Sequence, residues 1–483
     1  MNKIIVISII IIFLLSTSLI ANIPAFEIDN EKSEEMRIVK HSEENSFDGY
    51  ILYTPWFDTM TYLIDNNNDT VRKGISFHAP ALAVYLLENG QLLRSEVKIS
   101  NPTFAHGGIS GLVKKFWWSG KSVWEFEYSN NLHCLHNDIE PLPNGNILMA
   151  AWEYKTYDEA IDAGCNPNLL TEGEIWPDHI IEVEPTGSSG GNIVWEWHVW
   201  DHLIQDYDPL KDNYGIVADH PELIDINFRG SSFKDDWNHI DSIDYNEEFN
   251  QILLSVRHMN EIWVIDHSTT TEDAANHSGG NSGKGGDLLY RWGNPQTYRA
   301  GYENDQQLFG QHDARWIKSD IPGEGHITIF NNGWNRPEGK YSSVEEIVPP
   351  VDNNGSYYLT PGSAYGPEGP IWRYTAENKT DFYSSFLSGA QRISNGNTLI
   401  CSGENGIFFE VNPGKEIVWE YINPFPVSFL NNVFKFTYYP PDYPGLEKFT
   451  NSQKNNYSLY GFQWLKQKYP FLTLILNKIK EMI

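Results

Sequence analysis

Cysteine is scarce in this chain of 483 residues, which has only Cys134, Cys165 and Cys401. Three cysteines are too few for a disulfide-held scaffold, and an odd number leaves at least one without a partner in the chain. Positive charge is scarce too, because 34 Lys and Arg stand against 64 Asp and Glu and the formal net charge is −30. Such a surface repels phosphate, so the composition argues against a nucleic-acid partner.

Long apolar runs are missing except near the first residue. Lys3 precedes an apolar run from Ile4 to Leu15, and small and polar residues follow, which is the pattern of an export signal. The run could extend to Ile20, so an uncleaved membrane anchor is the alternative. We expect an exported protein that is periplasmic, extracellular or anchored at the outer face of a membrane. Residues 1–25 would be the signal peptide or anchor and 26–47 a polar linker.

Turn-forming and aromatic residues are abundant, with 38 Gly, 26 Pro, 17 Trp and 26 Tyr, and they favour a β-rich chain. Short strands joined by tight turns, often through Asn-Gly, recur in five segments. These inner hairpins are residues 79–95, 135–153, 237–260, 310–333 and 388–406. A second kind of hairpin usually ends in Trp, which we expect to pack between neighbouring sheets. These outer hairpins are residues 60–75, 113–128, 180–199, 262–295, 355–378 and 406–424.

One hairpin of each kind makes four strands, which is one blade of a β-propeller. Six outer hairpins predict an all-β fold with six blades over residues 48–445. The missing inner hairpin would combine 48–57 with 432–441, so that the two chain ends close the ring and leave no free edge. A β-sandwich array is the competing fold, but it would not give this sustained alternation. Residues 446–483 would be a tail with an amphipathic helix that docks on the propeller or lies on lipid.

Histidine begins the innermost strand of three predicted blades. In a propeller these strands line the central shaft, so His136, His239 and His312 would converge on one pocket although they are far apart in sequence. An aspartate follows each of them within one or two residues: Asp138, Asp241 and Asp313. The corresponding starts of the other inner hairpins carry no histidine, so the fold itself does not require one there.

Arg257 adds a positive charge to this pocket. It lies on the expected partner strand of the hairpin that begins at His239, where alternation would put Arg257 and His258 on opposite faces. Three histidines could instead hold zinc, but a guanidinium would oppose a dication and no fourth ligand is evident. We therefore predict no metal and no cofactor. Imidazoles beside a guanidinium suit a tetrahedral anion, with neutral imidazole as the nucleophile.

Four stretches carry a resemblance to a known family: "HNDIEPLPNGN", "DDWNHIDSIDYNEEFNQILLSVRHMNEIWVID", "GQHDARWI" and "SGAQRISNGNTLICSGENGIFFEV". Over about 49–445 the chain resembles the bacterial and archaeal aryl-sulfate sulfotransferases that use no nucleotide sulfate donor. The resemblance implies an exported six-bladed propeller. Its small-molecule partners would be an aryl sulfate donor and a phenolic acceptor, and sulfuryl would pass between them through a sulfohistidine in a ping-pong reaction.

The resemblance also implies roles for individual residues. By motif position, His312 looks like the nucleophile and His136 like a further histidine of the pocket. His239 and Arg257 look like the pair that binds the sulfuryl oxygens. Asp241 stands where the family often has Asn, and it would orient His239 or weaken binding of the sulfate donor. Asp313 would fix the tautomer of His312, and Asp138 would be a further orienting carboxylate.

Two other functions remain open on sequence grounds. The first is a non-catalytic exported propeller that binds anionic ligands or a protein partner. The second is a metal-dependent hydrolase built on the same histidines. Membrane association through residues 4–20 or through the C-terminal helix is compatible with each function, and the sequence makes no prediction about the oligomeric state.

Overall fold

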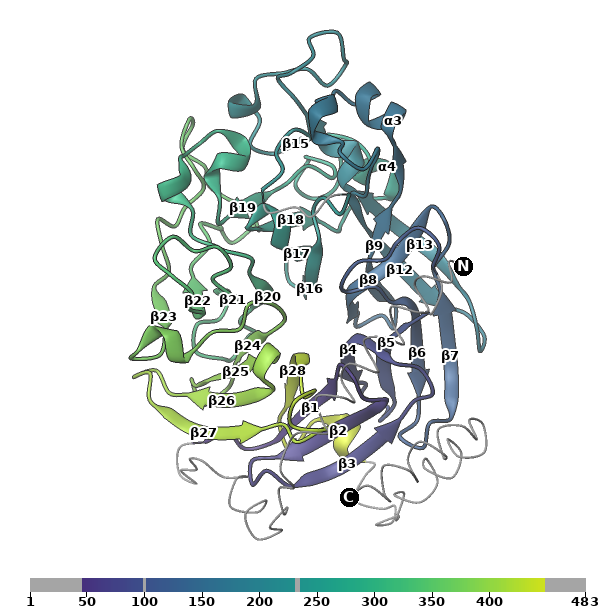
Figure 1. Ribbon diagram of the computed structural model, residues 1–483, viewed down its shortest axis with the longest axis vertical. Helices are drawn as coiled ribbons and strands as arrows, with labels where there is room; N and C mark the ends of the chain where they lie inside the picture. Colours follow the sequence, from purple (N-terminus) through teal and green to yellow (C-terminus); the bar gives the residue numbers. More distant parts are fainter. Residues whose placement is uncertain (1–45, 99–100, 231–234, 448–483) are drawn as a thin grey trace, which may run out of the picture. The chain divides into compact units, whose positions relative to one another are not determined.

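The computed structural model describes residues 46–98, 101–230 and 235–447. They form six four-stranded antiparallel sheets arranged in a ring (Figure 1). The prediction of a six-bladed β-propeller is thus confirmed. The expected signal or anchor, nearly all of the linker and the C-terminal helix fall outside the described residues. Within the described ranges, no helix has the length and apolarity needed to span a bilayer.

The four strands of a blade follow one another from the shaft outwards. From the innermost strand outwards, the first blade consists of β4 (Pro80–Leu86), β5 (Leu92–Val97), β6 (Gly111–Phe116) and β7 (Ser122–Glu127). The second consists of β8 (His133–Pro141), β9 (Ile147–Glu153), β12 (Asp178–Pro185) and β13 (Gly191–His198). The third consists of β16 (Ile240–Asn246), β17 (Gln251–Val256), β18 (Glu261–Asp266) and β19 (Tyr290–Trp292). The fourth blade consists of β20 (His312–Trp316), β21 (Ile327–Asn331), β22 (Ser343–Ile347) and β23 (Trp372–Tyr374). The fifth consists of β24 (Gly389–Arg392), β25 (Thr398–Ser402), β26 (Ile407–Val411) and β27 (Ile417–Ile422). The sixth consists of β28 (Val433–Tyr439), β1 (Tyr50–Pro55), β2 (Met60–Asp65) and β3 (Thr70–Ile75).

The ring closes as expected, by pairing the two ends of the described chain. β28 runs antiparallel to β1, with Tyr50 opposite Tyr439 and Tyr53 opposite Phe436. The innermost strands then contact one another in a complete circle, from β4 through β8, β16, β20, β24 and β28 back to β4. Closure pairs the edge that an open sheet would expose.

Tryptophans of the outermost strands join neighbouring blades, as their positions predicted. At five of the six interfaces, an indole N–H donates a hydrogen bond to the outer turn of the next blade. The pairs are Trp124 with Gly190 O (2.7 Å), Trp195 with Thr269 Oγ1 (3.0 Å), Trp292 with Pro367 O (2.8 Å), Trp372 with Pro413 O (3.2 Å) and Trp419 with Asn66 O (3.0 Å). At the sixth interface, Arg72 of β3 lies over the ring of Trp118, 5.1 Å from its centroid.

The outer hairpin expected over 355–378 begins earlier than predicted. Its first strand is β22 (Ser343–Ile347), and only β23 (Trp372–Tyr374) falls inside the expected range. Prolines and glycines in "TPGSAYGPEGP" interrupt a strand ladder, because proline has no N–H to donate. This stretch is instead part of a long loop, in which Tyr357 stacks on Tyr290 of the preceding blade at 4.8 Å.

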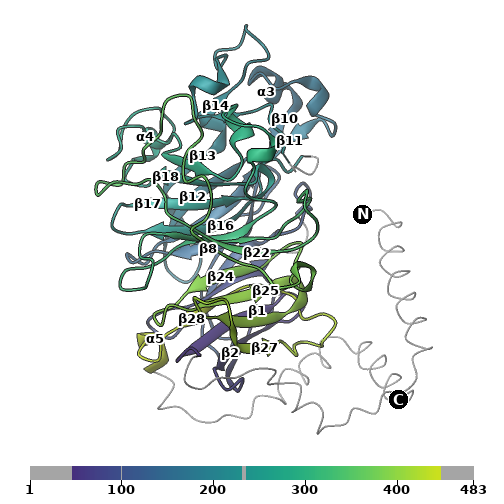
Figure 2. The same ribbon diagram turned by 90° about the vertical axis from the view of Figure 1, so that its left-hand side faces the viewer.

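A large insertion separates β13 from β16, and a second long loop separates β18 from β19. The insertion contains η2 (Val199–His202), β14 (Leu203–Ile204), η3 (Val217–Asp219) and β15 (Ile224–Asp225), and the loop contains α4 (Thr271–Ala274). The connection from β9 to β12 adds β10 (Lys155–Thr156), α3 (Tyr157–Asp162), η1 (Pro167–Leu169) and β11 (Glu174–Ile175). Figure 2 shows these segments together at one end of the propeller.

Candidate active site

Irregular backbone marks one end of the innermost strands. The pairing of β4, β8, β16 and β20 with the next strand shifts register near the start of each. Non-glycine residues with positive φ lie at the same level: Leu82 (154°), Asn137 (47°), His239 (56°), Asp313 (53°), Leu387 (60°) and Ser388 (90°). Bulges and backbone strain are concentrated at functional sites because the surrounding fold must hold them in place.

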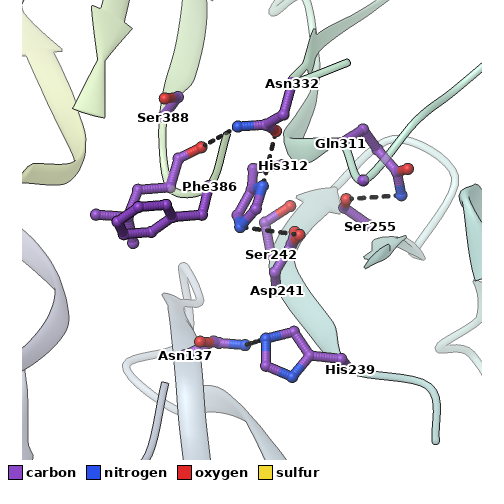
Figure 3. Close-up of polar contacts among 12 residues, drawn as sticks. Asn137, His239, Asp241, Ser242, Ser255, Gln311, His312, Asn332, Phe386 and Ser388 are labelled. Carbon is purple, nitrogen blue, oxygen red and sulfur yellow. Dashed lines mark hydrogen bonds and ion pairs between the residues drawn. The ribbon is translucent and has the colours of Figure 1, made fainter. Parts of the chain in front are cut away.

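His312, the first residue of β20, is buried and has a defined tautomer. Its Nδ1 lies 2.8 Å from Asn332 Oδ1. The amide nitrogen of Asn332 donates to the carbonyls of Ser384 (2.8 Å) and Leu387 (2.9 Å), so the amide oxygen must face the imidazole. Nδ1 of His312 therefore carries the proton, and Nε2 presents a lone pair (Figure 3).

The surroundings of His312 keep the imidazole neutral. Burial lowers the pKa of His312 well below its usual range, and the nearby charges of Arg257 and His239 lower it further. Asp241 Oδ2 lies 3.6 Å from His312 Nε2. Burial raises the pKa of Asp241 well above its ordinary value, although Ser255 and Arg257 offset part of this rise. A neutral Asp241 next to an unprotonated Nε2 avoids repulsion between a carboxylate and a lone pair.

His239 is paired with a carboxylate that was not among the predicted site residues. Its Nδ1 donates to Asp236 Oδ2 at 2.7 Å, and the amide nitrogen of Asn137 lies 3.2 Å from Nε2. Trp152 Nε1 donates to the other oxygen of Asp236 at 3.0 Å. Burial alone would raise the pKa of Asp236, but the neighbouring imidazoles, His239 first, hold it below the ordinary value. An ionised Asp236 can stabilise His239 when it accepts a proton at Nε2.

His136 belongs to a second histidine–carboxylate pair. Its Nε2 lies 2.8 Å from Asp178 Oδ1, and its ring stacks on Trp152 with centroids 4.1 Å apart. Its ring centroid is 5.8 Å from that of His239, so two of the predicted histidines are neighbours. Nδ1 of His136 is buried and makes no hydrogen bond among the described residues.

Arg257 lies in a turn, not on a strand. β17 ends at Val256, and Arg257 begins the 3-10 turn η4 (Arg257–Met259), where its N–H donates to His239 O at 3.1 Å. The expected placement of Arg257 and His258 on opposite faces of a strand is therefore wrong. Burial lowers the pKa of Arg257, while Asp241 and Asp236 counteract this effect. The guanidinium is thus close enough to both carboxylates to interact with them.

His258 was not predicted as a site residue, but it contacts the site directly. Its ring stacks on His239 with centroids 4.8 Å apart, and its Nδ1 lies 3.0 Å from Asp236 O. Burial lowers the pKa of His258 to about 3, so this imidazole is neutral. His258 therefore adds packing against His239 without adding charge.

Two of the predicted orienting carboxylates link blades instead of contacting histidines. Asp313 Oδ1 lies 2.9 Å from Arg315 Nε, and its Oδ2 accepts from Ala390 N at 3.2 Å. Asp138 Oδ2 lies 2.6 Å from Lys435 Nζ and accepts from Ile243 N at 3.0 Å. The expectation that Asp313 fixes the tautomer of His312 is wrong, because Asn332 occupies that position.

The third predicted carboxylate also differs from its expected role. Asp241 contacts His312, whereas Asp236 orients His239. The residues that sequence reasoning missed are thus Asn332, Asp236, Asp178 and His258. Asp236 stands three positions before His239, and Asn332 ends the hairpin that His312 begins, so their positions offered a signal. Asp178 comes from another segment and carries no distinguishing pattern.

An apolar wall adjoins His312. Leu82, Leu387 and Phe434 form a buried cluster against which Trp56 and Phe386 pack. The ring centroid of Phe434 is 6.3 Å from that of His312, in an edge-to-face arrangement. Leu82 and Leu387 both adopt positive φ, so backbone strain accompanies the apolar surface. A flat aromatic molecule is the kind of ligand that such a wall suits.

A metal at this site would compete with Arg257. Asp236, His239 and His258 present ligand atoms within 4.8 Å of one another. Both oxygens of Asp236 already accept hydrogen bonds, from His239 and Trp152, and the neighbouring guanidinium opposes a dication. The arrangement therefore suits an anion better than a cation, because Arg257 and the imidazoles can surround an anion.

Comparison with known proteins gives matches to one family. The family model for arylsulfotransferase (ASST) matches residues 88–424. Arylsulfate sulfotransferase AssT of Lelliottia amnigena is 25% identical over 315 residues, which are 58% of this chain and 46% of that protein. The chain thus spans about half the length of the curated relative that it matches.

Similar solved structures have low sequence identity to this chain. A protein of unknown function from Bacteroides caccae is 11% identical and has a TM-score of 0.43, over 81% of this chain and 98% of that one. A streptogramin B lyase is 12% identical with a TM-score of 0.35, over 80% of this chain and 82% of that one.

Proposed function

The chain belongs to the arylsulfotransferase (ASST) family, and we propose that it transfers a sulfuryl group from an aryl sulfate ester to a phenol, with His312 as the nucleophile. The observation that carries the proposal is the hydrogen bond from His312 Nδ1 to Asn332, which directs an unprotonated Nε2 into the site. The apolar wall around Phe434 supports an aromatic donor and acceptor. We also propose export of the protein, which the apolar run near its first residue supports.

In the first half-reaction, the lone pair of His312 Nε2 attacks sulfur. The N–S bond forms, the S–O bond to the aryl group breaks, and the phenolate leaves with the electron pair. Arg257 and His239 bind the sulfuryl oxygens as their charge is redistributed. His239 or His136, each paired with a carboxylate, supplies a proton to the departing phenolate.

In the second half-reaction, the acceptor phenol gives its proton to the imidazole that supplied one before. The phenolate oxygen attacks sulfur, the N–S bond breaks, and His312 returns to its neutral form. Sulfo-imidazole is a good leaving group because the ring carries positive charge while sulfur is attached. The cycle is ping-pong, it balances without ATP or a nucleotide sulfate, and it requires no metal step.

The test is detection of the covalent intermediate. The protein is incubated with p-nitrophenyl sulfate without acceptor, quenched, digested and examined by mass spectrometry. We expect sulfuryl on His312, release of p-nitrophenol in a burst, and loss of both in His312→Ala. His326→Ala is the matched control, because His326 lies at the other end of the same hairpin and pairs with Glu346 at 2.7 Å. Equal turnover in His312→Ala, or binding of the sulfate without turnover, would contradict the proposal.

A further inference from the structure

A second group of chemistry-bearing residues lies outside the shaft, where the insertion after β13 meets the loop between β18 and β19. His202 ends η2, and His277 and Asp287 belong to the loop of the next blade. One ligand atom from each of these three residues lies within 4.8 Å of the others. In Figure 1, α4 and β15 mark this region, away from the centre of the ring.

One carboxylate oxygen meets two imidazole nitrogens in this cluster. Asp287 Oδ1 lies 2.9 Å from His202 Nδ1 and 2.7 Å from His277 Nδ1. Nε2 of His202 lies 2.8 Å from the carbonyl oxygen of Ala274, which can only accept, so Nε2 carries a proton. Nδ1 can then donate to Asp287 only in the charged imidazolium, because in the neutral ring its lone pair faces the carboxylate oxygen. A cation held by both groups would satisfy the neutral ring and the carboxylate together.

The surroundings hold His202 in the orientation of a metal ligand. Its side chain is fully buried, and it stacks on Trp197 with centroids 5.7 Å apart. Trp197 Nε1 donates to Gly286 O at 2.7 Å, which fixes the backbone next to Asp287. A Cβ at Gly286 would collide with Ala274 O and with the ring of His202, so only glycine fits there. A hydrogen bond on the far nitrogen of a histidine is the usual support for a metal ligand.

A cavity adjoins this cluster at one of its three residues. It has a volume of about 430 Å³, and its lining includes His277, His220 and Asp201, but neither His202 nor Asp287. The side chain of His277 is 61% exposed, whereas that of Asp287 is 8% exposed. His277 therefore connects the buried pair His202 and Asp287 to solvent.

We propose that His202, His277 and Asp287 bind Zn²⁺ and thereby clamp the insertion of one blade to the loop of the next. Two imidazoles and a carboxylate are a donor set that zinc accepts, with a water as the fourth ligand. The site is separate from the histidines of the shaft, and the inference does not depend on sulfuryl transfer.

The test measures zinc on the full chain. The protein is stripped with a chelator and dialysed, and ZnCl₂ binding is followed by titration calorimetry, with the stoichiometry checked by elemental analysis. We expect one zinc per chain in the wild type and an affinity at least about a hundredfold lower in His277→Ala and Asp287→Asn. Zinc should also raise the melting temperature of the wild type but not of His277→Ala, because a ligand of the native state stabilises it.

Two control variants separate this site from its neighbours. His220→Ala changes the lining of the same cavity and should retain zinc with unchanged affinity. His239→Ala removes a potential ligand of the shaft and should also retain one zinc. Since His277 is largely exposed, His277→Ala should fold, as circular dichroism would verify. Undiminished binding in His277→Ala and Asp287→Asn, absence of binding in the wild type, or loss of zinc in His239→Ala would each overturn the proposal.

Discussion

At the scale of single residues, the tautomer of the proposed nucleophile depends on the neighbouring side chain of Asn332. The amide of Asn332 is fixed by two carbonyls and leaves only one tautomer to His312. Two carbonyl acceptors prevent the amide from turning over, so the orientation of His312 is decided by the backbone around Leu387. A positioning residue of this kind affects the chemical step more than binding.

Replacing Asn332 tests this role. In Asn332→Ala, both tautomers of His312 become accessible, and we expect kcat to fall about 10²-fold while KM for the donor changes little. Asn332→Asp should remain impaired, because a carboxylate at this position favours protonated imidazole, which has no free Nε2. The measurement is steady-state kinetics with p-nitrophenyl sulfate. A rise in KM with unchanged kcat would assign Asn332 to substrate binding instead.

Asp241 predicts a particular dependence of activity on pH. Its raised pKa means that it is neutral at low pH and becomes negative as pH rises through that pKa. The carboxylate then repels the anionic donor, so kcat/KM should fall on the alkaline side. Because the pKa of His312 is lowered, kcat/KM should not fall on the acid side until the pH is well below 6.5.

Asp241→Asn isolates this effect. The amide cannot ionise, so the alkaline fall in kcat/KM that is due to Asp241 should disappear, and the activity at neutral pH should equal or exceed that of the wild type. The measurement is a profile of kcat/KM against pH for both proteins. An unchanged alkaline limb in Asp241→Asn would show that another group produces it.

At the scale of the element, register shifts occur in inner and in outer strand pairs. Those near the starts of β8, β16 and β20 turn side chains towards the site. The outer pairs β6–β7, β12–β13, β26–β27 and β2–β3 shift register as well. What distinguishes the inner end is the group of non-glycine residues with positive φ, such as Asn137, His239 and Asp313.

The contribution of one indole can be measured. Trp195→Phe keeps an aromatic ring but removes the hydrogen bond to Thr269 Oγ1. We expect the free energy of unfolding to fall by about 1 kcal/mol, with some further loss from packing, in a urea titration. Trp117→Phe is the control, since Trp117 is 38% exposed and its replacement should change little. Equal losses in both variants would mean that the hydrogen bond between blades contributes nothing.

At the scale of the whole molecule, charged groups inside the shaft connect strands that are remote in sequence. Lys435 of β28 is buried, 2.6 Å from Asp138 Oδ2 on β8 and 3.4 Å from Asp313 Oδ1 on β20. Because β28 closes the ring, this lysine ties the closing strand to two other blades. Burial raises the pKa of Asp138, and Lys435 opposes that rise.

Breaking this network should weaken the ring as a unit. Lys435→Met leaves the buried carboxylate of Asp138 without its cation, while Asp313 keeps Arg315, and we expect a loss of about 3–5 kcal/mol in the free energy of unfolding. Adding Asp138→Asn to Lys435→Met should restore part of the lost free energy of unfolding, since the uncompensated charge of Asp138 is removed. Lys98→Met breaks an exposed pair with Glu127 and should cost less than about 1 kcal/mol. Denaturant unfolding of the four proteins provides the comparison.

The sequence by itself determined the blades and the location of the candidate site. Turn chemistry such as Asn-Gly and alternating apolar residues act over a few neighbours, so the hairpins and their order could be predicted. Of the three histidines expected at strand starts, only His312 begins its strand, because His136 is the fourth residue of β8 and His239 precedes β16. The closing pair of β1 and β28 followed from the one inner hairpin that was missing. The hairpin predicted over 355–378 is wrong in its first strand. Apolar residues flank the proline-rich loop in this range, just as they flank a turn between two strands.

Only the tertiary structure decided which groups meet at those strand starts. The pairing of β20 with β21 inside one blade brings Asn332, which follows β21, to His312, and the turn after β17 places Arg257 beside His239. Asp313 lies next to His312 in sequence, yet positive φ in the bulge directs its carboxylate to the neighbouring blade. Such contacts depend on backbone distortions and on blades far apart in the chain, which local sequence patterns do not encode.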